Sequence, residues 1–348
     1  MCGIVGGVTE RNIVPILIEG LHRLEYRGYD SAGIAYKEEK NVLLVKSLGR
    51  VHDLEKKLHK KATSNIGIAH TRWATHGIPS EKNAHPHSSN KNIYVVHNGI
   101  IENHEDLKSE LKSEGFKLYS QTDSEVIGHL IEFYKQRGMD FDSSVMKAIS
   151  RLKGAYALAV MDKNEPETLI GVRQSSPLVV GEGFDENFLA SDIMALSPVT
   201  NKFKFLDDGQ VAFVTKNKIS ISSKDGRAAK VPTKEVDSTA YTNDLNGYSH
   251  FMEKEIYEQP QAILNTLDGR VGGDDVRDDI FGIGSSELFK KVKRIQIVAC
   301  GTSLHAGRVA ANWFSSISEL PTQTDYASEY RLKGSPSAAA QDACIPVL

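Results

Sequence analysis

The sequence predicts a layered α+β domain followed by a shorter α/β segment. Two sets of short apolar runs, punctuated by Gly, Asn and Asp, are typical of strands and occupy much of residues 2–225. Stretches of helical period enclose these sets, an arrangement that favours a layered fold. Beyond residue 250, a strand-like run turns directly into a helical run, which is the pattern of an α/β unit.

The first domain is expected to open with an apolar strand over residues 2–8 and a helix over residues 11–25. The helix is predicted because Ile13, Leu17 and Leu24 recur on one face at helical spacing. The strand-like runs that follow are 32–36, 42–46, 66–70 and 93–97. Two helical stretches come next, near 102–115 and 124–137. After Gly154 the pattern is β-rich again, with AYALAVM, TLIGV, PLVVG, NFLAS and VAFVT.

A chain of 348 residues suggests two domains. We expect the first domain over residues 1–225, a polar linker over 226–250 and the second domain over 251–348. The second domain should begin with a helix in HFMEKEIYEQPQAILNTL, where Pro260 must kink or start a helix. The strand IQIVAC then turns at GTS into a helix, LHAGRVAANWFSSISEL.

The composition is that of an ordinary globular protein, with 40% hydrophobic and 25% charged residues. A net charge of −3 gives no electrostatic reason to expect nucleic acid or a membrane surface as partner. No apolar run reaches the ~20 residues that a membrane-spanning helix needs, and the N-terminus lacks the features of a secretory signal. The three cysteines, Cys2, Cys300 and Cys344, are too sparse for a disulfide framework and indicate the reducing cytoplasm.

Cys2 is a candidate nucleophile because a small residue after the initiator Met permits removal of Met1. The thiol would then lie beside a free α-amine, which titrates near ~8 and can act as its general base. Gly3 leaves room for a substrate. By itself a terminal cysteine is more often a small apolar residue in a packed core, so this interpretation depends on the rest of the sequence.

Four further segments provide that support: RGYDSAG at 27–33, HTRWATHG at 70–77, HNGIIENH at 97–104 and QTDSE at 121–125. In this order, behind an N-terminal CGIVG, they resemble a class II glutamine amidotransferase domain of the N-terminal-nucleophile hydrolase superfamily. The full set is highly specific, whereas no single motif is. The resemblance implies a four-layer α/β/β/α sandwich and hydrolysis of glutamine by Cys2.

The resemblance also implies how free glutamine is held. Arg72 would bind its carboxylate through a bidentate pair, and Asp123 would pair with its ammonium, so that a free amino acid is selected. Thr75 and His76 resemble residues that complete this pocket. Either Arg72 or Asp123 alone would most often be a surface charge or a structural pair.

The catalytic end of the site is implied in the same way. The Asn98 side-chain amide and the Gly99 backbone N–H resemble the oxyanion hole of the family, where one donor contributes ~3 kcal/mol. Outside this context, Asn98-Gly99 is first a hairpin-turn signal. Arg27 resembles a residue that positions the cysteine end of the site, and Trp73 resembles a tryptophan that screens the site from the ammonia route.

No metal and no cofactor are expected. His85-Pro86-His87 has a spacing found in metal sites, but no cysteine or carboxylate accompanies it. His85 matches a family position, for which a structural role is at least as well supported as a catalytic one. The acidic stretch GGDDVRDD at 272–279 is interpreted as a solvated loop.

Motifs in the second domain indicate, again by resemblance, which molecule accepts the ammonia. YSHFMEKEIYEQP and VACGTS resemble the isomerising glutamine–fructose-6-phosphate aminotransferases, whose second part is a pair of sugar-isomerase (SIS) domains that usually dimerise. There, backbone N–H groups at a strand–helix turn cradle a phosphate. The residues that resemble the start of this sugar-phosphate site are Cys300, Gly301, Thr302 and Ser303. Without the context, GTS is no more than a tight turn.

The resemblance covers residues 2 to about 331, and the tail LKGSPSAAAQDACIPVL departs from it. We therefore expect a truncated or frame-shifted chain whose incomplete α/β segment packs poorly or depends on a partner chain, as in a family-type homodimer. The family moves ammonia from glutamine to fructose 6-phosphate, giving glucosamine 6-phosphate and glutamate. This chain should retain only the glutaminase half of that reaction.

Two alternatives stay open at this point. The chain could be a non-catalytic, truncated product, because the isomerase part is incomplete. It could also be a class II amidotransferase with another acceptor, such as phosphoribosyl pyrophosphate. The ACGTS and MEKEI segments argue against the second alternative.

Overall fold

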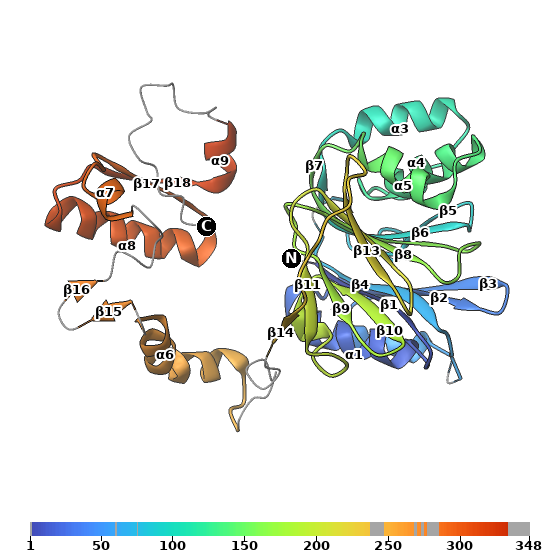
Figure 1. Ribbon diagram of the computed structural model, residues 1–348, viewed down its shortest axis with the longest axis horizontal. Coiled ribbons are helices and arrows are strands. Elements are labelled where there is room, and N and C mark those ends of the chain that lie inside the picture. Colours follow the sequence, from blue (N-terminus) through green and yellow to red (C-terminus); the bar gives the residue numbers. More distant parts are fainter. Residues whose placement is uncertain are drawn as a thin grey trace. The chain divides into compact units, whose positions relative to one another are not determined.

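The computed structural model describes residues 2–59, 61–74, 76–236, 247–267, 270–272, 275–276 and 285–332. The chain divides into two compact units, Met1–Asp244 and Leu245–Leu348 (Figure 1). Each unit is described below by itself.

Two antiparallel sheets form the centre of the N-terminal unit. The eight-stranded sheet contains, in spatial order, β14 (Lys234–Glu235), β11 (Lys202–Phe205), β9 (Val179–Glu182), β10 (Glu186–Ala190), β1 (Gly3–Thr9), β4 (Ile66–Arg72), β2 (Ser31–Glu38) and β3 (Asn41–Leu48). The six-stranded sheet contains β13 (Ile219–Ser223), β12 (Gln210–Val214), β8 (Leu169–Gln174), β7 (Gly154–Asp162), β6 (Ile93–Ile101) and β5 (His87–Ser89).

Successive side chains of a strand point to opposite faces of its sheet, and this alternation creates the layers. On β1, Ile4 and Val8 belong to a buried cluster that includes residues of both sheets, whereas Val5 points to the opposite face and packs among helix residues. The strands near the middle of each sheet therefore bury both faces. The central layer of side chains is apolar and binds the two sheets together.

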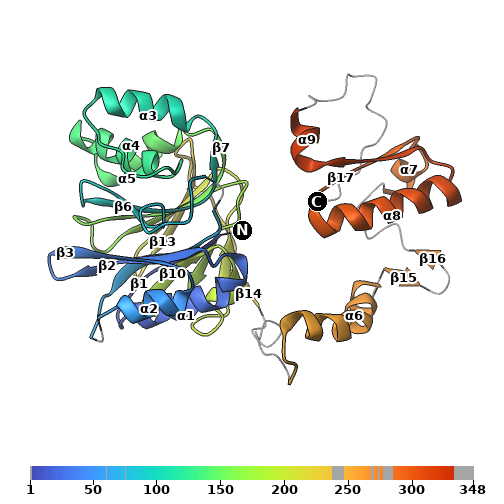
Figure 2. The ribbon, with the colours of Figure 1, turned by 180° about the vertical axis from the view of Figure 1, so that it is seen from behind.

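Helices cover the outer face of each sheet, so the unit has four layers in the order helix, sheet, sheet, helix (Figures 1 and 2). The eight-stranded sheet is covered by α1 (Val14–Leu24) and α2 (Val51–Lys57). The six-stranded sheet is covered by α3 (His104–Ser113), α4 (Glu125–Gln136) and α5 (Phe141–Ile149). The predicted four-layer α/β/β/α fold is confirmed.

Local sequence explains most of these elements. In α1, Leu17, Leu21 and Leu24 are fully buried on one face, and a proline occupies the first turn, where its missing N–H costs nothing. The prediction missed α2, which has only two apolar residues, and α5, which is short although its apolar residues recur at helical spacing. Asp140 begins α5 by accepting a 2.7 Å hydrogen bond from the Ser143 N–H.

One difference affects the site. The sequence pattern ended the strand of β6 at residue 97, and Asn98-Gly99 alone is a turn signal. In the structure, β6 continues to Ile101, and Asn98 and Gly99 pair with Ala157 and Tyr156 of β7. The sheet therefore holds both residues in mid-strand.

The C-terminal unit contains one parallel strand pair, β17 (Ile295–Ala299) and β18 (Thr322–Tyr326). The helix α8 (Gly301–Ile317) connects these two strands and buries Leu304 and Gly307. The remaining elements are α6 (Phe251–Leu267), β15 (Val271–Gly272), β16 (Asp275–Val276), α7 (Ser285–Phe289) and α9 (Ala327–Leu332).

The structure refines the expectations for this unit. The helix α6 runs through Pro260, which excludes one of the two expected alternatives, a helix that starts at this proline. The helix α8 begins at Gly301 and ends at Ile317, three residues before each end of the predicted span. Within the acidic stretch, Gly272 and Asp275 pair in a short antiparallel ribbon. The rest of that stretch, part of the linker (237–246) and the tail from residue 333 lie outside the described residues.

Within the described ranges, no helix has the length and apolarity to cross a membrane.

Candidate active site

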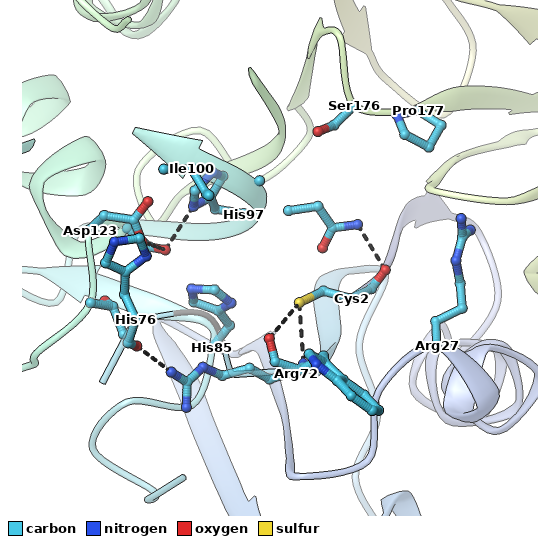
Figure 3. A pocket seen from close by; sticks show the side chains of 15 residues that line it. Cys2, Arg27, Arg72, His76, His85, His97, Ile100, Asp123, Ser176 and Pro177 are labelled. Atoms are coloured by element: carbon cyan, nitrogen blue, oxygen red, sulfur yellow. Dashed lines mark hydrogen bonds between the residues drawn. The ribbon is translucent and has the colours of Figure 1, made fainter. Parts of the chain in front are cut away.

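A cavity of about 290 Å³ in the N-terminal unit collects the predicted glutamine-site residues (Figure 3). Its lining consists of Cys2, Arg27, Arg72, Trp73, His76, His85, His97, Asn98, Gly99, Ile100, Thr122, Asp123, Ser124, Ser176 and Pro177. The sequence had pointed to Thr75 as well, but this residue lies outside the described residues. Arg72 comes from the eight-stranded sheet, Cys2 directly precedes strand β1 of that sheet, and Asn98 comes from the six-stranded sheet, so the cavity lies between the two.

The Cys2 thiol lies against the backbone that follows β4. Its Sγ accepts a hydrogen bond from the Trp73 N–H at 3.2 Å and lies 3.5 Å from the Trp73 carbonyl oxygen. Burial raises the pKa of the Cys2 thiol, while the hydrogen bond from Trp73 opposes this shift. The free thiol is therefore the resting form at neutral pH, and a reaction that needs a thiolate also needs a base.

Arg72, the last residue of β4, is 3% exposed and is held by the chain that follows it. Its Nη2 donates to the carbonyl oxygens of His76 at 2.5 Å and Gly77 at 3.1 Å, and its Nη1 donates to that of Ile78 at 3.4 Å. The Asp30 carboxylate lies 3.8 Å from Nη1. The guanidinium is thus fixed before any ligand arrives.

The RGYDSAG segment supports this arrangement from β2. The Asp30 carboxylate accepts a short hydrogen bond from the Ala74 N–H, and the Asp30 N–H donates to the Arg72 carbonyl oxygen at 3.1 Å. A Cβ on Gly28 would lie 2.8 Å from the carbonyl carbon of Arg72, so the close approach requires glycine. Asp30 lies inside a motif that the sequence analysis recognised, yet no role was assigned to it there.

Asn98 and Gly99 both line the cavity, and the Asn98 side chain contacts Cys2. The Asn98 Nδ2 donates to the Cys2 carbonyl oxygen at 3.1 Å. Gly99 has φ +122°, and a Cβ there would lie 2.0 Å from the Ala155 carbonyl oxygen. Only glycine can therefore occupy this position of β6 without displacing β7.

Asp123 precedes α4 and is 3% exposed. Its Oδ2 accepts a 2.7 Å hydrogen bond from the Ile101 N–H, and the Ser124 hydroxyl lies 3.4 Å from its Oδ1. A buried carboxylate with these contacts, at the edge of a cavity, can receive a cationic group.

Arg27 and Trp73 lie at the rim of the cavity. The Arg27 guanidinium donates to the Ser191 carbonyl oxygen at 3.2 Å and to the Asp192 carboxylate at 3.1 Å, which ties it to the segment after β10. The Trp73 side chain is 47% exposed and meets the Tyr29 ring edge-on, with centroids 5.5 Å apart. Its indole is thus at the surface of this unit, while its backbone contacts Cys2.

Four buried histidines cluster at the cavity: His70, His85, His87 and His97, of which His85 and His97 line it. Burial lowers the pKa of each, that of His70 to about 3. The imidazoles are therefore neutral at working pH. No group of three ligating side chains suited to a metal ion occurs in the described part of the chain. His85 lines the cavity and also packs edge-on against His70 and His87, so it takes part in both the cavity and the core.

Several lining residues were not anticipated. Thr122 and Ser124 flank Asp123, and His97 and Ile100 flank Asn98-Gly99, so neighbourhood to a motif could have indicated them. Ser176 and Pro177 come from the segment between β8 and β9 and carry no signal in the sequence. They reach the cavity only because the sheets bring that segment over Cys2.

The predicted sugar-phosphate residues belong to the C-terminal unit. Cys300 is the N-cap of α8, and Gly301, with φ +58°, begins that helix. All of Cys300, Gly301, Thr302 and Ser303 are exposed at the turn between β17 and α8. The strand–turn–helix context expected for this segment is thus present.

Comparison with known proteins agrees with the division of the chain into two units. Residues 70–198 match a family model described as a glutamine amidotransferase domain. Residues 288–347 match the SIS domain model. The second match passes residue 331, so the expectation that the family pattern ends there is wrong.

Relatives align along nearly the whole chain. The glutamine–fructose-6-phosphate aminotransferase (isomerizing) of Pseudomonas putida is 48% identical over 335 residues, which are 96% of this chain and 55% of that protein. The protein of the same name from Haemophilus influenzae is 49% identical over 338 residues, with the same coverage. The chain therefore spans about half the length of the relatives that it matches.

Solved structures support the fold. The glutamine phosphoribosylpyrophosphate amidotransferase of B. subtilis, complexed with ADP and GMP, superposes with a TM-score of 0.57 at 20% identity. The match covers 93% of this chain and 65% of that one, and at this identity it shows the fold alone. Residues 70–198 are thus similar to glutamine amidotransferase domains and residues 288–347 to SIS domains, and over 96% of its length the chain is similar to the isomerising glutamine–fructose-6-phosphate aminotransferases.

Proposed function

We propose that the N-terminal unit hydrolyses glutamine to glutamate and ammonia, with Cys2 as nucleophile. One observation carries this proposal: the Cys2 thiol, the Asn98 amide and two buried charges of opposite sign, Arg72 and Asp123, line a single cavity. A nucleophile, an oxyanion donor and a paired cation and anion are the groups that a free amino acid with a side-chain amide requires.

Binding comes first. The Arg72 guanidinium, pre-set by the carbonyls of residues 76–78, receives the carboxylate of glutamine, and Asp123 receives its ammonium. His76 lines the same cavity. Because these contacts are anchored by backbone, the side-chain amide of the substrate is directed toward Cys2 at little entropic cost.

Chemistry follows at the amide carbon. Removal of Met1 frees the α-amine of Cys2, which takes the thiol proton as the sulfur attacks. The carbonyl oxygen becomes an oxyanion that accepts hydrogen bonds from Asn98 Nδ2 and the Gly99 N–H. The C–N bond then breaks, the amine returns the proton to the leaving nitrogen, and ammonia departs. Water hydrolyses the thioester, releasing glutamate and restoring the thiol.

The acceptor proposal rests on the relatives. Proteins 48–49% identical to this chain carry the name glutamine–fructose-6-phosphate aminotransferase, which favours fructose 6-phosphate over phosphoribosyl pyrophosphate. Cys300, Gly301, Thr302 and Ser303 would begin the sugar-phosphate site. We assign the glutaminase half-reaction to this chain, because the cavity that supports it lies within the N-terminal unit.

The wider assignments are part of the same proposal. We place the body of the glutaminase domain at residues 1–225, the linker at 226–250 and the start of the SIS domain at 251–348. Within the linker span, β14 adds an edge strand to the eight-stranded sheet of the glutaminase domain. We further propose that the protein acts in the cytoplasm, uses no cofactor and forms a family-type homodimer.

Glutamate release from glutamine tests the proposal. The purified chain should form glutamate and ammonia in equal amounts, and Cys2→Ala should abolish both products. Retained activity in Cys2→Ala would refute the assignment of the nucleophile. Cys300→Ala is the matched control, because Cys300 is exposed in the other unit and should be dispensable for this half-reaction.

A second experiment tests whether the α-amine of Cys2 is the general base. Intact mass should show loss of Met1 in the active protein. A tag left at the N-terminus should abolish activity, whereas the same tag at the C-terminus should not. Equal activity from both proteins would overturn the role of the α-amine.

A further inference from the structure

We propose that His70 is a positioning residue for glutamine hydrolysis, which sets the orientation of the Asn98 side-chain amide so that its NH₂ group faces the reacting carbonyl. This inference rests on the proposed function and adds a residue to it. His70 lies on β4, does not line the cavity and touches no substrate. It acts through Asn98.

The hydrogen-bonding partners of His70 determine which ring nitrogen carries the proton. Its Nε2 lies 3.1 Å from the His97 carbonyl oxygen and 3.0 Å from the Asn98 Oδ1. A backbone carbonyl can only accept, so Nε2 must be an N–H donor. Burial keeps the pKa of His70 at about 3, so the ring is neutral and its Nδ1 carries no proton.

The second hydrogen-bonding partner of Asn98 determines which way its side-chain amide points. At the other end of the amide, Nδ2 donates to the Cys2 carbonyl oxygen at 3.1 Å. A flipped amide would direct Oδ1 at that carbonyl and NH₂ at the His70 N–H, which sets acceptor against acceptor and donor against donor. One backbone carbonyl on β6 therefore fixes the His70 proton, and that proton fixes the direction of the Asn98 donors.

Packing prevents the His70 ring from turning away. The Nδ1 of His85 is 3.2 Å from both ring nitrogens of His70, and the two rings are at 86°. His85 therefore directs its edge at the face of the His70 ring. The backbone of His85 is itself held, because a Cβ on Gly33 of β2 would lie 2.1 Å from the His85 carbonyl oxygen. His70 is thus clamped between β2, β6 and His85.

The consequence is catalytic preorganisation. An oxyanion donor contributes only if it already points at the place where charge develops. In a freely flipping amide, half of the orientations would present an oxygen to the oxyanion. The arrangement around His70 removes this alternative, and it needs no charge to do so.

Steady-state kinetics with a variant pair tests the role. His70→Phe fills the ring volume but removes the donor, and we expect kcat to fall 10–100-fold with little change in KM for glutamine. Asn98→Ala should cost more. If His70 acts through Asn98, the double variant should be no slower than Asn98→Ala alone. Multiplying effects, or a change confined to KM, would overturn the proposal.

A control separates this role from general damage to the core. His129 on α4 is 3% exposed and contacts Ser89, away from the cavity lining, so His129→Phe should leave kcat unchanged. His70→Gln, whose amide can donate in place of the imidazole, should recover part of the rate lost in His70→Phe. Equal loss of rate in His129→Phe would assign the effect to folding.

A spectroscopic arm does not depend on activity. In protein labelled with ¹⁵N-histidine, the His70 signals are identified by their loss in His70→Phe. We expect the neutral Nε2–H form at pH 7, and in His70→Phe we expect the Asn98 side-chain amide protons to exchange faster. A proton on Nδ1, or unchanged exchange, would overturn the inference. If the parent protein releases no glutamate, the proposed function fails, while this arm still decides the orientation of Asn98.

Discussion

The Asn98 side chain donates a 3.1 Å hydrogen bond to the backbone carbonyl oxygen of Cys2. The two residues are far apart in sequence and lie on different sheets, Cys2 just before β1 and Asn98 on β6. The contact therefore joins the proposed nucleophile to its proposed oxyanion donor across the interface between the sheets. Movement of one sheet against the other would misalign them, so the proposed mechanism depends on the apolar layer that holds the sheets together.

Substitution of Arg72 tests the carboxylate site. Arg72→Lys keeps the charge but loses the fork that meets the carbonyls of residues 76–78. We expect KM for glutamine to rise about 10–100-fold, equivalent to about 1.4–2.8 kcal/mol, with a smaller change in kcat. The exposed Arg227→Lys is the control and should be silent. A fall in kcat alone would argue against a binding role.

Asp30→Asn tests a residue of the RGYDSAG motif to which the sequence pattern assigned no role. The amide can still accept from the Ala74 N–H, but the negative charge 3.8 Å from the Arg72 guanidinium is lost. We expect kcat/KM for glutamine to fall about tenfold, or ~1.4 kcal/mol. Asp53→Asn on the exposed face of α2 serves as the comparison. Wild-type kinetics in Asp30→Asn would show that the charge is dispensable.

Gly99→Ala tests the backbone of the oxyanion hole. The new Cβ would meet the Ala155 carbonyl oxygen at 2.0 Å and would hold a residue at φ +122°. We expect a loss of about 3 kcal/mol or more in the free energy of unfolding, with no measurable glutaminase. Gly115 has φ +89° and open space around it, so Gly115→Ala introduces the backbone strain without a steric clash. This variant should lose about 1–2 kcal/mol in the free energy of unfolding. Urea denaturation followed by circular dichroism compares the two.

The buried histidines predict a dependence of stability on pH. Burial lowers the pKa of His70 to about 3 in the folded state, well below the unfolded value of 6.5. The unfolded chain therefore binds more protons in this window. The contribution of the neutral ring is complete above pH 6.5 and is lost as pH falls toward 3.

Urea midpoints between pH 7 and pH 5 measure this effect. His85, His87 and His97 shift in the same direction and steepen the loss. In His70→Phe the slope of unfolding free energy against pH should be shallower by up to ~1.4 kcal/mol per pH unit. Identical slopes in the two proteins would mean that His70 is not neutral in the folded state.

Much of the fold could be read from periodicity. The alternation in β1 and the spacing of Leu17, Leu21 and Leu24 in α1 are local signals, because burial imposes the strand and helix periods directly on the chain. The short helix α2 has only two apolar residues and shows no period, whereas Phe141, Val145 and Ile149 in α5 do recur at helical spacing and could have revealed that helix. The extension of β6 through Asn98-Gly99 was hidden because a local turn preference is overridden by pairing with β7.

The sequence by itself determined which motifs belong together, and it predicted the chemistry of the site: which residue attacks and which charges hold a free amino acid. Only the tertiary structure decided how those groups are held. The roles of Asp30 and His70, the reach of Ser176-Pro177 and the direction of the Asn98 amide depend on contacts between strands that are distant in the chain. Such contacts leave no period and no spacing in the sequence, because hydrogen bonds between sheets are set by the register and packing of the folded layers.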